Sequence, residues 1–302
     1  MIRSIDAASD RYLDALRSIN DRIARAQREV STGKRVATPS DDPDSISALL
    51  QVRAELGRVT QAKTNLSRVQ TEVDTAESML QSAVTLFDRV RSLGATAASG
   101  TSTAVTREGI ADELKSIIER FAGLSNTEVD GRYIFSGDTD QSPAYAVDFD
   151  TQTPPWGTYL GTTSTRQAAH PTGIEFDVAM TAKAIFDNDD ASKNVMQSIE
   201  TLRQALLAGD DDTIEDALAP LSGISQHLNA ALMFYGTVQT QIDNGISTSE
   251  SLILRLSSER ADLENADSTA AILELEQATY QQTAALKVKA AAPRASLFEY
   301  LD

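Results

Sequence analysis

The sequence contains no cysteine, only two histidines and few aromatic residues. Without cysteine, neither disulfide bonds nor thiolate chemistry is available to the chain. Aromatic residues make up 5% of the sequence although 41% is hydrophobic, which favours a thin core rich in Ala, Leu and Val. Basic residues are also scarce, with 27 Lys and Arg against 44 Asp and Glu. Because nucleic-acid-binding proteins usually carry a basic surface, the net charge of −17 argues against a nucleic-acid partner.

The sequence also lacks an apolar run long enough to span a membrane, so we expect no membrane partner. A cleaved signal peptide is not expected either, because charged residues interrupt the N-terminal stretch in which its apolar segment would lie. These residues are Arg11, Arg17, Arg22 and Arg25. The sequence therefore predicts a cytosolic protein, or one exported by a route that uses no cleaved signal.

Residues that could carry catalysis or bind a metal do not form a recognisable site. His170 precedes a turn and His227 flanks a helical stripe, and neither has a nucleophile in a known motif. Lys34 follows a glycine as in a phosphate-binding loop, but Arg35 stands where Ser or Thr is required. The acidic segment 187–190 lacks the later acidic ligands of a calcium loop. We expect no enzymatic activity, no cofactor and no metal, and we expect these Asp residues to serve in surface charge and helix capping.

The longest continuous pattern runs from Pro43 to about Ser99, where apolar or small residues recur every three or four positions. This spacing predicts a long helix with a coiled-coil seam. Asp42 is expected to cap the helix, and Pro43 suits its first position. At about 1.5 Å per residue the helix would be roughly 80 Å long, too long for a compact domain of this size. The seam positions are Leu49, Val52, Leu56, Val59, Ala62, Leu66, Val69, Val73, Ala76, Leu80, Ala83, Phe87, Val90, Gly94 and Ala97.

Similar patterns predict helices towards both ends of the chain. Heptads cover residues 1–30 and 224–263, and shorter helical patterns cover 110–124 and 195–206. The last helix is expected from about Ser268. Its seam is predicted at Ile272, Leu275, Thr279, Gln282 and Leu286. The order of short and long helices at each end allows antiparallel pairing that brings the two termini together.

The segment between the helices has a different pattern. A strand is predicted over Gly131–Gly137, and alternation over Ile174–Val178 together with turn residues indicates further short strands. Gly209–Asp212 is predicted to break the helical pattern. The fold class is therefore mainly α: an elongated antiparallel helical bundle or coiled-coil rod formed by both chain ends, with a small inserted β domain. The expected domains are 1–42 with 265–302 as a terminal assembly domain, 43–136 with 191–264 as a helical rod domain, and 137–190 as the β insert.

Three stretches of the sequence resemble a known family. Ser31–Arg35 followed by Pro39–Pro43 is similar to the loop after the first helix in the bacterial flagellin and hook-associated protein family. Gly131–Gly137 resembles the entry to the variable domain in the hook–filament junction member, and Ala295–Leu301 resembles its C-terminal tail. Pro293 departs from the pattern, because proline bends or ends a helix.

The resemblance implies a secreted structural subunit of the bacterial flagellum, located in the adaptor ring at the hook–filament junction. It implies export by the flagellar type III pathway and a cytoplasmic export chaperone that holds the C-terminal helix. The implied partners are other copies of the chain in the ring, a neighbouring hook-associated protein and flagellin. We expect the terminal helices to form the contacts between subunits. The residues expected there are Ile5, Tyr12, Leu16, Ile19, Ile23, Ile272, Leu275, Leu286, Leu297, Phe298 and Leu301.

Other functions are compatible with parts of the sequence. A short flagellin that forms the filament itself would share the helical ends. A type III needle-tip or translocator protein would also be acidic and coiled, but a translocator should carry a long apolar segment. An enzyme would need a constellation of reactive side chains that this sequence does not offer.

Overall fold

The computed structural model describes residues 2–99, 102–148 and 154–291, with side chains from Ser9 onward. The chain forms two compact units, Met1–Arg58 with Leu252–Asp302 and Val59–Ser251. It is mainly helical, as predicted. The helices are α1 (Ile2–Thr32), α2 (Ile46–Ala97), α3 (Ala104–Ser125), α4 (Ala182–Phe186), α5 (Val195–Ala208), α6 (Asp211–Leu218), α7 (Leu221–Glu264) and α8 (Ser268–Ala291). The strands are β1 (Glu128–Val129), β2 (Arg132–Tyr133), β3 (Gln167–Ala169) and β4 (Glu175–Asp177).

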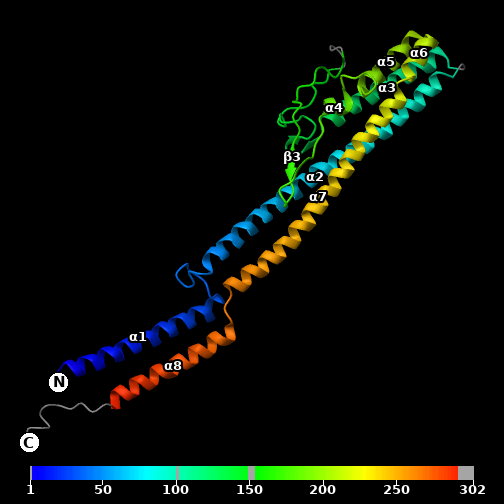
Figure 1. Ribbon diagram of the computed structural model, residues 1–302. Coiled ribbons are helices and arrows are strands. Elements are labelled where there is room, and N and C mark those ends of the chain that lie inside the picture. The colour runs from blue at the N-terminus through cyan, green and yellow to red at the C-terminus, as the bar shows by residue number, and fades with distance from the viewer. Residues whose placement is uncertain (1, 100–101, 149–153, 292–302) are drawn as a thin grey trace, which may run out of the picture. The chain divides into compact units, whose positions relative to one another are not determined.

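Helices α2 and α7 run antiparallel and side by side (Figure 1). Within the unit Val59–Ser251, polar pairs fix the register of α2 against α7. Lys63 Nζ lies 2.8 Å from Glu250 Oε1, and Gln70 Nε2 lies 2.8 Å from Asp243 Oδ1. The predicted seam of α2 is confirmed, since its residues are buried or half-buried throughout. The α7 seam is buried at the apolar residues Ile224, Leu228, Ala231, Tyr235, Val238 and Ile242 and at Ser249.

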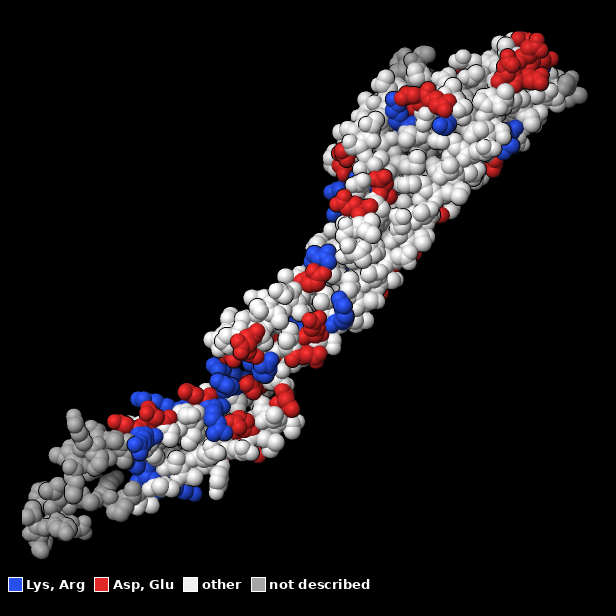
Figure 2. All heavy atoms as spheres, viewed as in Figure 1, with Lys and Arg blue, Asp and Glu red and all other residues white. Residues whose placement is uncertain are grey.

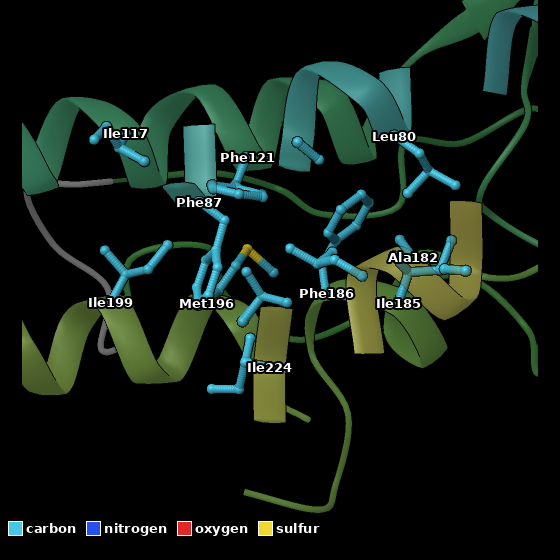
Figure 3. Packing of buried hydrophobic residues seen from close by; sticks show 14 of the residues in the cluster. Leu80, Phe87, Ile117, Phe121, Ala182, Ile185, Phe186, Met196, Ile199 and Ile224 are labelled. Atoms are coloured by element: carbon cyan, nitrogen blue, oxygen red, sulfur yellow. The ribbon is translucent and has the colours of Figure 1, made fainter. Parts of the chain in front are cut away.

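Helices α3, α4 and α5 complete one hydrophobic core with α2 and α7 (Figure 3). Phe186 of α4 contacts Phe121 of α3 edge-to-face, with ring centroids 5.8 Å apart. Phe87 of α2 lies in the same cluster as Ile224 of α7 and Met196 of α5. Because α6 also contributes Ile214 and Ala217, residues from six helices form this core, which belongs to the whole unit Val59–Ser251 and not to any single helix pair.

The helix ends follow local capping chemistry. Thr103 accepts a hydrogen bond from the Thr106 amide at the start of α3, and Asn194 does so from Gln197 at the start of α5. Gly209 ends α5 in the left-handed conformation with φ of +74°. The break predicted over 209–212 is shorter than expected, because α6 already begins at Asp211.

Helix α2 begins later than predicted. Its first helical residue is Ile46, whereas Pro43 lies in a turn. Asp42 still caps this region, since its carboxylate accepts a hydrogen bond from the Ser45 amide at 3.2 Å. The turn separates the capping residue from the regular helix by three residues, 43 to 45.

The β hairpin at the start of the insert is shorter than the sequence suggests. Strands β1 and β2 pair antiparallel around Asp130 and Gly131, whose φ angles of 50° and 77° suit the tight turn of a two-residue hairpin loop. Of the strand predicted over Gly131–Gly137, only Arg132–Tyr133 is paired. Gly137 is also specifically required, because its φ is +66° and a Cβ there would meet the Thr162 carbonyl oxygen at 2.4 Å.

The remainder of the insert is mostly irregular chain with one further hairpin, β3–β4. Its large side chains Tyr145 and Trp156 are buried and belong to the same hydrophobic cluster as the helices. Arg166 reaches Glu72 of α2 with 2.5 Å between Nη1 and Oε2. The insert therefore has no separate hydrophobic core among the described residues.

Candidate functional site: the terminal helix pair

Helices α1 and α8 form an antiparallel pair, as predicted (Figure 1). The hydroxyl of Tyr12 donates to the Ala285 carbonyl at 3.2 Å near one end. Towards the other end, Arg22 Nε donates to Glu274 Oε1 at 2.6 Å. These two contacts fix the register of one helix against the other between Glu274 and Ala285 of α8.

The contact between the two helices buries little surface. In the part of the pair that the structure describes, the fully buried side chains are alanines: Ala26, Ala271 and Ala278. The predicted residues of α1 are half-buried, namely Tyr12, Leu16, Ile19 and Ile23. Because burial stabilises roughly in proportion to apolar area, this pair contributes far less to its own stability than the core of Val59–Ser251 contributes to that unit.

The seam predicted for α8 is right at Leu275 and Gln282, which are half-buried, and wrong by one residue at Ile272, Thr279 and Leu286, which are exposed. Ile272 and Leu286 are 46% and 51% exposed, whereas Leu275 is half-buried. The residues that face α1 are Ala271 and Ala278. Small side chains let two helices approach more closely than large ones do, so the alanines lie at the centre of the contact and half-buried larger residues such as Leu275 lie beside them.

This displacement leaves large apolar side chains exposed on α8. Leu273, Tyr280 and Val288 are 52%, 77% and 71% exposed, in addition to Ile272 and Leu286. We call these five residues the outer apolar surface. The sequence analysis missed Leu273, Tyr280 and Val288 because they lie off the predicted seam. These three residues could have been predicted from the distribution of apolar residues over more than one face of α8. A helix with a single partner needs only one apolar face.

Four of the predicted interface residues are not placed by the structure. The side chain of Ile5 lies outside the described ones, although its backbone belongs to α1. Leu297, Phe298 and Leu301 lie outside the described residues. The same holds for Pro293 and its predicted effect on the last helix.

The polar contacts of the pair are mostly exposed. The hydrogen bond from Arg22 lowers the pKa of the Glu274 carboxyl below its ordinary value. Lys289 Nζ lies 5.2 Å from the centre of the Tyr12 ring, a cation–π contact. Exposed pairs of this kind contribute little to stability, so they mainly set register.

The histidines and the acidic segment make ordinary structural contacts. His170 Nδ1 lies 2.7 Å from the Thr172 hydroxyl, and His227 Nε2 lies 3.1 Å from the Ala184 carbonyl oxygen. Asp190 accepts hydrogen bonds from Ser192, as expected for a turn residue. Within the described residues, no group of three His, Cys, Asp or Glu side chains is arranged to hold a metal. Figure 2 shows another acidic patch over α6, whose sequence is rich in Asp.

No helix within residues 2–99, 102–148 and 154–291 combines the length and the hydrophobicity that crossing a bilayer requires.

Comparison with known proteins shows what the chain is similar to. Residues 5–140 match the family of the bacterial flagellin N-terminal helical region. The chain is 29% identical to flagellar hook-associated protein 3 of Salmonella typhimurium over 246 residues, which is 74% of each protein. The chain is therefore similar to flagellar hook-associated proteins over most of its length and to the flagellin N-terminal region over residues 5–140. A flagellin of Clostridium tyrobutyricum is 25% identical over 117 residues, or 38% of this chain and 31% of the flagellin.

The fold of this chain also occurs in solved structures. The structure of flagellar hook-associated protein-3 from Legionella pneumophila superposes with a TM-score of 0.62, covering 70% of this chain and 98% of that one at 11% identity. The predicted resemblance to the family is thus confirmed. The absence of catalytic motifs from this sequence agrees with its similarity to these flagellar structural proteins.

Proposed function

We propose that this chain is a structural subunit of the adaptor ring at the hook–filament junction of the bacterial flagellum. In this proposal copies of the chain form the ring, with a neighbouring hook-associated protein on one side and flagellin on the other. The chain is secreted through the flagellar type III pathway without a cleaved signal peptide. A cytoplasmic export chaperone holds its C-terminal helix before export.

The outer apolar surface is the observation that carries this proposal. Exposed contiguous apolar residues mark interaction surfaces, and here they lie on a terminal helix whose pairing with α1 buries mainly alanine. Leu273 and Tyr280 are one heptad apart, and Val288 follows Tyr280 by eight residues, or slightly more than two helical turns. That spacing suits contacts with further helices. We therefore propose the α1–α8 pair as the site of subunit contacts, including the residues Tyr12, Leu16, Ile19, Ile23, Ile272, Leu275 and Leu286.

The division of the chain into domains is part of the proposal. Residues 1–42 and 265–302 form the assembly domain, and 43–136 with 191–264 form the helical domain that carries it. The insert 137–190 faces outward from the assembled ring. The acidity of the insert and of α6 supports a solvated position for this part of the molecule.

A short flagellin is the second candidate function. The extent of similarity favours the junction protein, because the match to the hook-associated protein spans 74% of each chain. The match to the flagellin spans 31% of that protein. Location in the flagellum separates the two functions directly.

Immunogold labelling of isolated flagella tests the proposal. Antibody against the insert should mark one spot at the junction between hook and filament. Labelling along the whole filament would instead identify a flagellin, and labelling away from flagella would overturn both functions.

A matched pair of variants tests the role of the outer apolar surface. Tyr280→Glu places a charge on this surface, and Met233→Glu places one at a 73% exposed position of α7 in the unit Val59–Ser251. Both residues are exposed, so both variants should keep the melting temperature of the free protein. Only Tyr280→Glu should reduce the number of cells with attached filaments. Equal loss of filaments in both variants would contradict assembly through the terminal pair.

A further inference from the structure

The two connectors that lead into the terminal helices are bonded to each other. Residues 33–45 lead from α1 to α2, and residues 265–267 lead from α7 to α8. Three backbone hydrogen bonds join the first connector to the end of α7 and to the second connector. The amides of Arg35 and Val36 donate to the carbonyl of Glu264, the last residue of α7, at 2.8 and 3.2 Å, and the amide of Ala266 donates to the Gly33 carbonyl at 2.9 Å. The chain therefore passes between its terminal and inner helices through one joint and not through two independent ones.

The side chain of Glu264 lies at the centre of this joint. The residue is 5% exposed, and its carboxylate contacts Lys34 Nζ from one connector and Arg53 Nη2 from α2, the latter at 3.1 Å. Arg260, one turn earlier in α7, lies 4.0 Å away. The hydrogen bond from Lys34, with a further one from Arg53, lowers the pKa of the Glu264 carboxyl. In Figure 2, basic and acidic side chains lie next to one another over this part of the molecule.

A buried carboxylate is a costly choice if stability is the only requirement. Desolvation opposes the attraction between the charges, and apolar residues often stabilise such a position equally well. The best-attested use of a buried charge is to fix register. Among the described residues, the buried carboxylates are Glu72, Glu200 and Glu264, and only Glu264 lies in the unit that contains the terminal helices.

The packing of that unit shows why a register device is needed there. The α1–α8 contact buries mainly alanine, and the connector 33–42 contributes one buried side chain, Val36. Apolar packing therefore selects one arrangement of the connectors only weakly. The charge-assisted hydrogen bonds of Glu264 are stronger and more directional than neutral ones.

We propose that Glu264 is a positioning residue for assembly, whose contacts with Lys34 and Arg53 lock the two connectors so that α1 and α8 are presented to neighbouring subunits as one body. Glu264 touches no neighbouring subunit in this scheme and acts through the helices that it holds. The inference rests on the proposed function only in one respect, namely that the lock serves assembly with neighbouring subunits. The lock itself is a property of the free chain.

Hydrogen exchange of the free full-length protein tests the lock. In Glu264→Gln, the amides of Arg35, Val36 and Ala266 should exchange at least about tenfold faster, because they are the donors of the connector bonds and a tenfold change corresponds to about 1.4 kcal/mol. Amides in α3 and α5 should keep their rates. The control Glu259→Gln changes an exposed glutamate of the same helix and should alter none of these rates.

A second variant keeps the test informative if Glu264→Gln folds poorly. Lys34→Met removes one partner of the carboxylate at a side chain that is 48% exposed, and it should accelerate the same three amides. Added to Glu264→Gln, it should change their rates by less than it does alone, because the shared contact is already lost. Unchanged connector exchange in both single variants would overturn the lock, as would equal acceleration in α3 and α5.

Assembly gives the readout that a purely structural role would not affect. In cells, Glu264→Gln should lower the fraction with attached filaments while the melting temperature of the free protein stays within about 2 °C of the wild type, and Glu259→Gln should change neither. Normal filament attachment together with accelerated exchange would refute the positioning role. If labelling places the wild-type protein elsewhere than at the junction, the proposed function fails while the exchange result still decides the lock.

Discussion

Replacing Ile242 with alanine should lower the stability of the unit Val59–Ser251 strongly. Ile242 is 0% exposed on the α7 seam, and the adjacent Asp243 pairs with Gln70, which places this turn of α7 against α2. Removing a buried isoleucine side chain costs about 2–5 kcal/mol, since the lost contacts and the cavity add. For a unit of this size each kcal/mol lowers the melting temperature by about 2–4 °C, so a central value of about 3 kcal/mol predicts a decrease of about 6–12 °C.

The matched variant Ile19→Ala removes the same atoms from α1. Ile19 is half-buried in a contact whose fully buried residues are alanines, so the expected cost is below about 1 kcal/mol. Thermal unfolding followed by calorimetry and by helical circular dichroism should show the main transition shifted by Ile242→Ala and almost unmoved by Ile19→Ala. If Ile19→Ala lowers the main transition as far as Ile242→Ala does, the terminal pair belongs to the cooperative core and the reasoning is refuted.

Two further predictions concern the Glu264 joint and the insert. Because the pKa of Glu264 is lowered from its ordinary value of 4.5, its stabilising contribution is complete above that value and is lost as the pH falls through the lowered pKa. Exchange of the Ala266 amide should accelerate below about pH 4.5 in the wild type, beyond the intrinsic pH dependence, and a Glu264→Gln variant that keeps this acceleration would contradict the assignment. Gly137→Ala should cost about 1–3 kcal/mol by urea unfolding, because of its positive φ and the nearby Thr162 carbonyl. Gly109→Ala, in α3 with open space around it, should be neutral or slightly stabilising, and a loss as large as that at Gly137 would argue against backbone strain.

The long helices could be predicted from the sequence because their signal repeats many times. A seam that runs from Leu49 to Ala97 gives about seven consecutive heptads, and an error at one position does not change the result. In α8 two readings compete, since both Ala271 and Ile272 start an apolar series. Hydrophobicity favours the larger residue, whereas close approach of the helices favours the smaller one. Only the position of α1 decides between them.

The insert could not be predicted in the same way because single contacts hold its irregular backbone. The side-chain amide of Asn126 donates to the Tyr145 carbonyl at 2.8 Å and accepts from the Tyr145 backbone amide at 3.0 Å. One side chain thus makes the two hydrogen bonds that a neighbouring strand would otherwise make. Arg166 and Glu72 are 94 residues apart in sequence but in contact in space. Such pairs have no periodicity in the sequence. The sequence therefore showed that the helical pattern ends in this segment but did not show how the segment folds. The Glu264 joint was missed for the same reason.

The pairing of α2 with α7 has a consequence for the order of events in folding. The polar pairs between these helices join residues 173 and 187 positions apart, for Gln70 with Asp243 and Lys63 with Glu250. Contacts between such distant parts of the chain slow folding, because the entropy of closing the loop is lost before the contact forms. While Leu221–Ser251 is not yet available for folding, the core lacks the residues that α7 contributes. Phe87 then lacks its contacts with that helix. The part of the chain that precedes Leu221 therefore keeps the apolar residues that pack against α7 uncovered until α7 is available.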